Sequence, residues 1–261
     1  MKQNLIRQRW AEGVPAIGTF MFSRDPATTE IAAHSGYDFV IPDIEHAPLD
    51  MRDVEAHIRA AEANGITSLV RIASGDLAVV NRLLDLGAAG LIYPHFGVNR
   101  EDSRAFSERL RYGPNGSRPS CASVRATRYS MITHGAYTKH SDHDTIGIGL
   151  IEDIEAVNNL ESILEECKVD LIMPGAGDLS TSMGLAGQQN HPDVRKLVDR
   201  IIAIAKAAGV RVGQYLRNPE EAREWKSHDM GIFVYQIDLK TLAAAYKKAN
   251  LDIRAAIAPG V

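Results

Sequence analysis

The fold of this chain is indicated by residues 37–48, YDFVIPDIEHAP, an apolar run that ends in two carboxylates and an imidazole. A short, nearly continuous hydrophobic run is typical of a buried strand in a parallel sheet, with Asp43, Glu45 and His46 then at its carboxyl end. In α/β barrels, chemistry takes place at this end of the strands. One such cluster fits a solvated loop with His46 capping the next helix equally well, so the ends of the other strands decide the interpretation.

Seven further apolar segments predict strands, and helical patterns separate them. The predicted strands cover residues 16–21, 67–70, 90–94, 146–151, 170–174, 210–215 and 231–235. Strict alternation of strands and helices implies a parallel sheet with right-handed crossovers. Eight units in 261 residues fit an α/β fold of the (β/α)8 TIM barrel type, with residues 1–261 in a single domain. A doubly wound sheet has the same alternation, but no G-x-G-x-x-G follows the first strand.

The longest irregular segment covers residues 111–145 and is rich in Gly, Ser, Arg and His. It follows the fourth strand and helix. In a barrel we expect it to form an extended loop over the carboxyl ends of the strands.

Composition excludes several classes of partner. Lys and Arg number 29 against 33 Asp and Glu, and the positive charges are scattered, so no nucleic-acid partner is expected. No segment has the pattern of a signal peptide or a membrane span, which predicts a cytoplasmic protein without a membrane partner. The two cysteines, Cys121 and Cys167, are far apart and indicate neither a disulfide framework nor a zinc site.

Polar residues follow several of the other predicted strands. Arg71 follows the third, Glu152 and Asp153 follow the fifth, and Asp178 follows the sixth. In a closed barrel these residues meet at one mouth. Glu152 and Asp178 provide hard oxygen donors on adjacent strands, which suit Mg²⁺ or Mn²⁺ better than zinc. Asp178 taken alone would serve equally as the N-cap of a helix.

Arg71 and His46 are candidates for substrate contact and proton transfer. A buried Arg71 needs an anionic partner or a polar cavity, and a structural ion pair with Asp43 or Glu45 is the alternative. His46 could move a proton near neutral pH, with Asp43 as the carboxylate that orients it. The loop containing Gly175 and Gly177 could bring its amides close to a small carboxylate.

Covalent catalysis is not indicated. No Ser-His-Asp or Cys-His arrangement stands out, and no lysine lies at a strand end where it could form a Schiff base. Chemistry through an enolate would therefore depend on a divalent ion chelated by the carboxylate and keto oxygen of a 2-oxo acid.

The chain resembles the HpcH/HpaI family of metal-dependent (class II) pyruvate aldolases over nearly its whole length. That family includes 4-hydroxy-2-oxoheptanedioate aldolase and the 2-keto-3-deoxy sugar-acid aldolases. The motifs that carry the resemblance are SGYD at 35–38, DIEHAP at 43–48, VR at 70–71, LDLGA at 84–88, RYGP at 111–114 with Gly116 and Arg118, IE at 151–152 and GAGDLS at 175–180.

The resemblance implies reversible cleavage of a 4-hydroxy-2-oxo acid to pyruvate or hydroxypyruvate and an aldehyde, through a metal-bound enolate. Glu152 and Asp178 would hold a divalent cation, Mg²⁺, Mn²⁺ or Co²⁺. His46 would be the acid/base, supported by Asp43 and Asp85. Arg71 would bind the keto oxygen and the developing enolate.

The resemblance also implies the substrate contacts and the assembly. The amides of Gly177 and Asp178 would bind the pyruvyl carboxylate. The family forms homo-oligomers, commonly hexamers, with sites near subunit interfaces, so Asp85 could act across such a boundary. The C-terminal helix would be available for exchange between subunits.

Three departures from the family pattern concern the substrate. The usual Gly-Pro-Ala-Asp is residues 175–178, GAGD, in this chain. A Gln common two residues before the metal-binding Glu is Leu150, and an aromatic residue near the end of the first strand, often Trp, is Phe20. These changes keep the metal ligands and bear on donor or acceptor preference, so Phe20 and Leu150 are counted as substrate-binding positions.

Two alternatives to an aldolase stay open. One is a related carbon–carbon lyase or synthase acting on a CoA thioester or on oxaloacetate, for which Arg118, Arg125 and Arg128 could contact a larger anion. The other is a non-catalytic barrel that binds a 2-oxo acid, because a fold does not establish activity.

Overall fold

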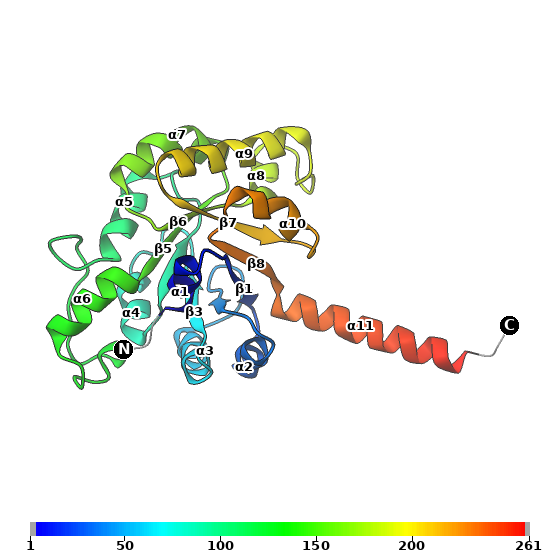
Figure 1. Ribbon diagram of the computed structural model, residues 1–261, viewed down its shortest axis with the longest axis horizontal. Coiled ribbons are helices and arrows are strands. Elements are labelled where there is room, and N and C mark those ends of the chain that lie inside the picture. The colour runs from blue at the N-terminus through cyan, green and yellow to red at the C-terminus, as the bar shows by residue number, and fades with distance from the viewer. Residues whose placement is uncertain (1–3, 259–261) are drawn as a thin grey trace.

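A computed structural model describes residues 4–258, apart from the side chain of Ser227, so residues 1–3 and 259–261 of the expected domain lie outside the described residues. Eight parallel strands form a closed barrel in chain order (Figure 1). They are β1 (Ala16–Met21), β2 (Phe39–Pro42), β3 (Thr67–Arg71), β4 (Gly90–Tyr93), β5 (Ile146–Ile151), β6 (Leu171–Pro174), β7 (Arg211–Leu216) and β8 (Ile232–Ile237). The predicted (β/α)8 barrel is confirmed, with β8 extending to Ile237 rather than ending at Tyr235.

Helices precede, connect and follow the strands, and most of them cover the outside of the barrel (Figure 1). They are α1 (Leu5–Ala11), α2 (Ala27–His34), α3 (Met51–Ala63), α4 (Val79–Leu86), α5 (Arg100–Arg109), α6 (His134–Asp144), α7 (Ile154–Glu166), α8 (Ala176–Ser182), α9 (Pro192–Ala207), α10 (Glu221–Trp225) and α11 (Asp238–Ile257), with 3₁₀ turns at Arg125–Thr127 and Lys226–His228. Local sequence sets several boundaries. Asp50 and Asp53 form a capping box at the start of α3, and Gly87 ends α4 with a φ of 102°.

The core has two layers because successive side chains of a strand point to opposite faces of the sheet. Phe39, Ile41, Leu69 and Ile148 fill the inside of the barrel. A second cluster, which includes Val70, Leu91, Ile151, Ile172 and Val212, packs between the strands and the helices. Inward and outward positions therefore alternate along β3, β5 and β6, and this alternation fixes which residue enters the barrel mouth at each strand end.

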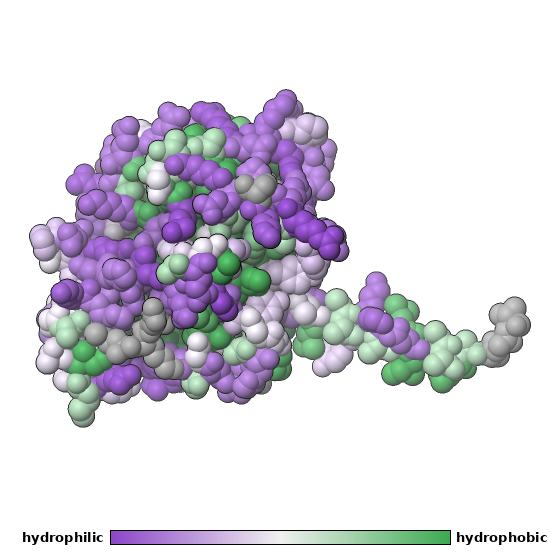
Figure 2. Space-filling model, in the orientation of Figure 1, coloured by the Kyte–Doolittle hydropathy of each residue, from purple (hydrophilic) through white to green (hydrophobic). Residues whose placement is uncertain are grey.

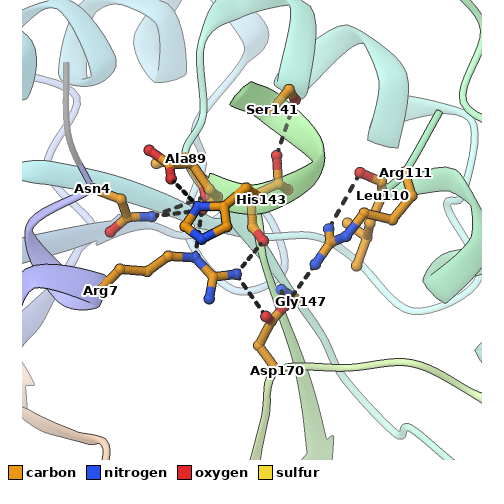
Figure 3. Close-up of polar contacts among 11 residues, drawn as sticks. Asn4, Arg7, Ala89, Leu110, Arg111, Ser141, His143, Gly147 and Asp170 are labelled. Carbon is orange, nitrogen blue, oxygen red and sulfur yellow. Dashed lines mark hydrogen bonds and ion pairs between the residues drawn. The ribbon is translucent and has the colours of Figure 1, made fainter. Parts of the chain in front are cut away.

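Helix α1 and residues next to the strands meet at the amino end of the barrel, and Figure 3 shows the polar contacts between them. The Asp170 carboxylate accepts hydrogen bonds from Arg7 at 2.6 Å, from Arg111 at 2.9 Å and from the Gly147 amide at 2.9 Å. Asn4 donates to the carbonyl of Asp144 at 3.0 Å. The Asp170 carboxylate therefore has partners of opposite charge on both sides, which stabilises this end of the barrel.

The expectation for residues 111–145 is wrong in position and in structure. The segment joins the end of α5 to the start of β5, so it lies at the amino ends of the strands. Its Arg125 donates to the Leu86 carbonyl at 2.7 Å, at the end of α4. It contains α6 and a 3₁₀ turn rather than a continuous irregular loop. An α-helical crossover returns the chain to the amino end of the barrel, which decides the location.

Helix α11 follows β8 directly and extends away from the barrel (Figure 1). None of its residues is buried. Its exposed large hydrophobic side chains are Leu239, Leu242, Tyr246, Leu251, Ile253 and Ile257, and apolar patches are visible along the projecting helix in Figure 2. No helix among the described residues has the length and hydrophobicity needed to cross a membrane.

Candidate active site

A cavity of about 360 Å³ opens at the carboxyl ends of the strands. It is lined by residues from most of the predicted set: Phe20, His46, Arg71, Leu150, Glu152, Gly177 and Asp178. The two-residue period of the strands explains the gathering. In β5, for example, Ile148 and Leu150 point inward, so Glu152 is the next inward position and lies at the mouth.

Arg71 is held in one orientation by two carboxylates. Its Nε and Nη2 donate to the Asp43 carboxylate at 3.0 and 2.5 Å, and Nε lies 3.4 Å from Glu45 Oε2. The guanidinium carbon lies 4.6 Å from the centre of the Phe20 ring. Burial disfavours the cation, but the hydrogen bonds and charge of Asp43, together with Glu45 and Glu152, outweigh it and raise the pKa of Arg71. Arg71 therefore stays charged at the mouth.

His46 lies at the edge of the mouth, with 56% of its side chain exposed. Its Nε2 is 3.7 Å from Glu45 Oε2, and burial raises the pKa of Glu45 although Arg71 and His46 oppose the rise. The expected pairing of His46 with Asp43 is wrong in this structure. The carboxylate of Asp43 instead binds Arg71 and accepts from the Glu45 amide at 3.0 Å, because Asp43 is the inward position that continues β2.

Glu152 and Asp178 bring two carboxyl groups together. Glu152 is 4% exposed, and burial with the contact to Asp178 raises its pKa to about 8, although the His95 amide opposes the rise. A Cβ on Gly175 would lie 2.7 Å from Glu152 Cγ, so only glycine leaves room for this carboxylate. Two close carboxylates of which one is buried repel each other when both are charged, and a cation between them removes that cost.

The residues present fit a divalent cation of the hard type. Among residues 4–258, no group of three His, Cys, Asp or Glu side chains could hold a metal ion, so the protein itself offers two carboxylates. This donor set suits Mg²⁺ or Mn²⁺, which bind one or two carboxylates and take their remaining oxygens from water and substrate.

The loop after β6 is helical rather than open. Gly175 is the N-cap of α8, so Gly177 and Asp178 belong to the first turn, where the amides have no partners within the helix. Both residues are exposed to the cavity. The amide nitrogen of the Gln189 side chain would lie 3.9 Å from a Cβ on Gly177.

Asp85 is not brought to this cavity. It lies in the last turn of α4, next to the start of β4 and so at the amino end of the barrel. Its carboxylate accepts from Nη2 of Arg118 at 2.9 Å, and the Arg118 side chain is fully buried. Within one chain, Asp85 and His46 therefore lie at opposite ends of the molecule.

Several residues of the mouth were missed by sequence reasoning. Tyr215, Gln189, Arg195 and Lys240 line the cavity, and His95 contacts Glu152. His95 carried the same signal as the residues that were found, because it comes just after β4. Tyr215, Gln189 and Arg195 reach the cavity through the path of the chain around β7 and α9, and Lys240 does so from the start of α11, which no local pattern indicates.

Known proteins resemble this chain over most of its length. The family model described as HpcH/HpaI aldolase/citrate lyase matches residues 16–244. The chain is 33% identical over 204 residues to the 2-dehydro-3,6-dideoxy-6-sulfogluconate aldolase of Pseudomonas putida, covering 78% of this chain and 79% of that protein. It is 29% identical over 258 residues to the hydroxypyruvate/pyruvate aldolase of Paraburkholderia phytofirmans, covering 96% and 98%.

A solved structure shows the same fold. The crystal structure of an HpcH/HpaI aldolase from Desulfitobacterium hafniense DCB-2 superposes with a TM-score of 0.90 and 26% identity, and covers 97% of each chain. These matches confirm the resemblance, the barrel and the expected class of enzyme, a carbon–carbon lyase. The chain belongs to the HpcH/HpaI aldolase/citrate lyase family.

Proposed function

We propose that this protein is a divalent-metal-dependent aldolase that reversibly cleaves a 4-hydroxy-2-oxo acid to pyruvate or hydroxypyruvate and an aldehyde. The observation that carries the proposal is the Glu152–Asp178 carboxyl pair beside a buried, charged Arg71. Such a mouth combines a cation site with a fixed positive charge, which is what a 2-oxo acid needs as it becomes an enolate. The aldolase names of the relatives agree with it.

Glu152 and Asp178 would hold the cation, which we expect to be Mg²⁺, Mn²⁺ or Co²⁺. When bound, it supplies positive charge to the carboxylate and keto oxygens of the 2-oxo acid. The amides of Gly177 and Asp178 are proposed to bind the substrate carboxylate. Phe20 and Leu150 form the apolar wall of the cavity against which the rest of the pyruvyl group would lie.

Arg71 is proposed to bind the keto oxygen and to stabilise the negative charge that develops on it. The Asp43 carboxylate accepts hydrogen bonds from Nε and Nη2 of Arg71, and no residue in the range 4–258 accepts one from Nη1. That leaves Nη1 to donate to the substrate. Because Asp43 and Glu45 already orient the guanidinium, little reorganisation is needed when the charge forms.

His46 is proposed to move the proton between the 4-hydroxyl group of the substrate and the solvent. Its exposed position next to Glu45 lets the imidazole exchange protons with the solvent and also face the substrate. Asp43 supports catalysis through Arg71 rather than through His46. We propose that Asp85 acts in the active site of a neighbouring subunit, because the active-site mouth of its own subunit lies at the opposite end of the barrel.

We propose a homo-oligomer, with a hexamer as the expected size and α11 exchanged between subunits. The support is an isolated twenty-residue helix with six exposed large hydrophobic side chains, which a second copy could cover. Light scattering of the full chain and of a chain cut before Asp238 would test this. We propose the cytoplasm as the compartment, because the substrates are small, water-soluble 2-oxo acids.

The test of the reaction is exchange of the pyruvate C3 protons in deuterated water, followed by NMR. The protein is treated with chelator and then supplied with Mg²⁺, Mn²⁺ or Co²⁺, beside a Glu152→Ala control. Exchange that requires metal and is lost in the control would support pyruvate enolisation without knowledge of the aldehyde. Folded protein that shows no exchange with any metal contradicts the proposal and favours a lyase acting on a CoA thioester or a silent binder.

A further inference from the structure

His95 has an unusual backbone conformation at the barrel mouth. It lies just after β4 and has a φ of 50°, in the left-handed region that residues other than glycine rarely adopt. Such a conformation persists only where the surrounding structure holds it in place. The Val98 amide donates to the His95 carbonyl at 3.2 Å and the Phe96 amide to the Leu150 carbonyl at 3.0 Å, which holds part of this turn. Two further contacts connect His95 itself to the residues that follow β5.

The first contact reaches the proposed metal ligand. The His95 amide donates to Oε1 of Glu152 at 3.2 Å. Among residues 4–258 no other hydrogen-bond donor of the backbone or of a basic side chain contacts this carboxylate. Glu152 is buried, so the direction of its oxygens depends on this amide together with the contact to Asp178.

The second contact holds the residue itself. Nδ1 of His95 lies 2.8 Å from Oδ2 of Asp153, with 42% and 29% of the two side chains exposed. The imidazole thus binds the residue adjacent to Glu152 while the amide binds Glu152. A side chain that could not reach Asp153 would remove the side-chain contact that helps to hold residue 95 in the left-handed region, with only backbone hydrogen bonds left to oppose relaxation.

We propose that His95 is a positioning residue for the metal site. Its imidazole, held by Asp153, keeps residue 95 in the left-handed conformation, and this aims the amide at Glu152 and orients that carboxylate for the cation. The inference rests on the proposed role of Glu152 as a metal ligand. Groups that orient metal ligands commonly change metal affinity by about 10–100-fold when they are removed.

The test is Mn²⁺ affinity of the metal-free full-length protein, measured by the electron paramagnetic resonance signal of free Mn²⁺, which does not depend on activity. His95→Leu removes the contact to Asp153 and disfavours the left-handed conformation, so we expect affinity to fall about tenfold or more. His95→Gly allows the left-handed conformation but loses the contact to Asp153, so its Mn²⁺ affinity should lie between those of the wild type and His95→Leu. His95→Asn tolerates the conformation and can donate to Asp153, so it should restore most of the affinity.

The chain offers a matched control. His143 also places Nδ1 2.8 Å from an aspartate, Asp144, in α6 at the amino end of the barrel. His143→Leu should leave Mn²⁺ affinity unchanged. A general loss of stability would lower affinity in both leucine variants and is checked by thermal unfolding in chelator.

A double-mutant cycle tests the route through Asp153. Asp153→Ala should weaken Mn²⁺ binding as His95→Leu does, and the double variant should be little worse than either, because both changes break one contact. Wild-type affinity in His95→Leu, or additive losses in the double variant, would overturn the inference. If Glu152→Ala itself binds Mn²⁺ like the wild type, the proposed function has failed instead, so the two failures are distinguishable.

Discussion

Two carboxylates at opposite ends of the barrel, the half-buried Asp170 and the buried Glu152, differ in how their charge is balanced. Asp170, just before β6, is bound by Arg7, Arg111 and the Gly147 amide (Figure 3). Glu152, just after β5, faces another carboxyl group, receives one amide and has a pKa raised to about 8, chiefly by burial.

The difference separates the two functions of the fold. A buried charge that is fully hydrogen-bonded fixes the structure, whereas a buried charge without a counter-charge costs stability. Asp170 at the amino end is hydrogen-bonded to its counter-charges and Glu152 at the carboxyl end is hydrogen-bonded to none among the described residues, as expected where stability and chemistry occupy opposite faces. A divalent cation would give Glu152 what Arg7 and Arg111 give Asp170.

The largest expected effect is on activity. Glu152→Gln keeps the size of the side chain but removes the negative charge that the cation needs. We expect the metal-dependent exchange of pyruvate protons to fall at least about a hundredfold, because the cation supplies several kcal/mol of charge stabilisation. The stability of the metal-free variant, measured by urea unfolding, should be retained or increased. If Glu152→Gln lost stability but kept its rate of pyruvate proton exchange, the assignment of catalysis to the carboxyl end and of stability to the amino end would be wrong.

Asp170→Ala is the converse change and should act on stability. It leaves two arginines without their common partner, which is expected to cost about 2–3 kcal/mol in the free energy of unfolding. Urea unfolding of the metal-free protein measures the loss. The exchange rate per folded molecule should stay close to that of the wild type, and a hundredfold drop in that rate would show that the amino end takes part in catalysis.

The pH dependence of stability should differ with and without metal. The pKa of Glu152 is raised from 4.5 to about 8 in the folded, metal-free protein, mainly because burial disfavours the charged form. The unfolded chain then loses its proton at lower pH than the folded one, so metal-free stability should decline as the pH rises from about 4.5 to 8. Mn²⁺ binds the ionised carboxyl and should oppose the decline. Thermal unfolding of Glu152→Gln should lack this component, and an unchanged pH profile would contradict the assignment.

The smallest expected effect compares two glycines in one loop. A Cβ on Gly175 would come 2.7 Å from Glu152 Cγ, whereas one on Gly177 would meet only the Gln189 amide nitrogen at 3.9 Å. Gly175→Ala should therefore shift Glu152 and weaken Mn²⁺ binding by about 1 kcal/mol or more, and Gly177→Ala should change it little. Isothermal titration of both variants measures this. Equal affinities would mean that the carboxylate moves aside without cost.

Most of the fold could be predicted because its signals are local. The apolar runs of β1 to β8 and the polar residues that follow β2, β3, β5 and β6 were visible in the sequence, and period-two alternation brings these ends to one mouth. Position after a strand was also enough to indicate Arg71, Glu152 and Asp178. The same criterion would have found His95, but a lone histidine after a strand carries no sign of its backbone conformation.

The sequence left the pairings within the site open because they depend on how the barrel closes. Asp43 was expected to orient His46, three residues away, with an ion pair between Arg71 and Asp43 or Glu45 as the alternative. The tilt of the strands brings Asp43 to Arg71 on β3, so the alternative is the one observed. Asp85 is present in a family motif, yet its place at the amino end depends on the direction of α4. Distance along the chain was a poor guide in both cases.

The sequence by itself determined the eight strand-helix units and the set of polar groups after the strands, because these depend on residue type and short-range periodicity. The tertiary structure alone decided that residues 111–145 cover the amino end, that Asp170 is neutralised while Glu152 is not, and that a left-handed His95 directs its amide at Glu152. Those outcomes depend on burial and on contacts between distant segments, which raise or remove the cost of a charge only after the barrel has closed.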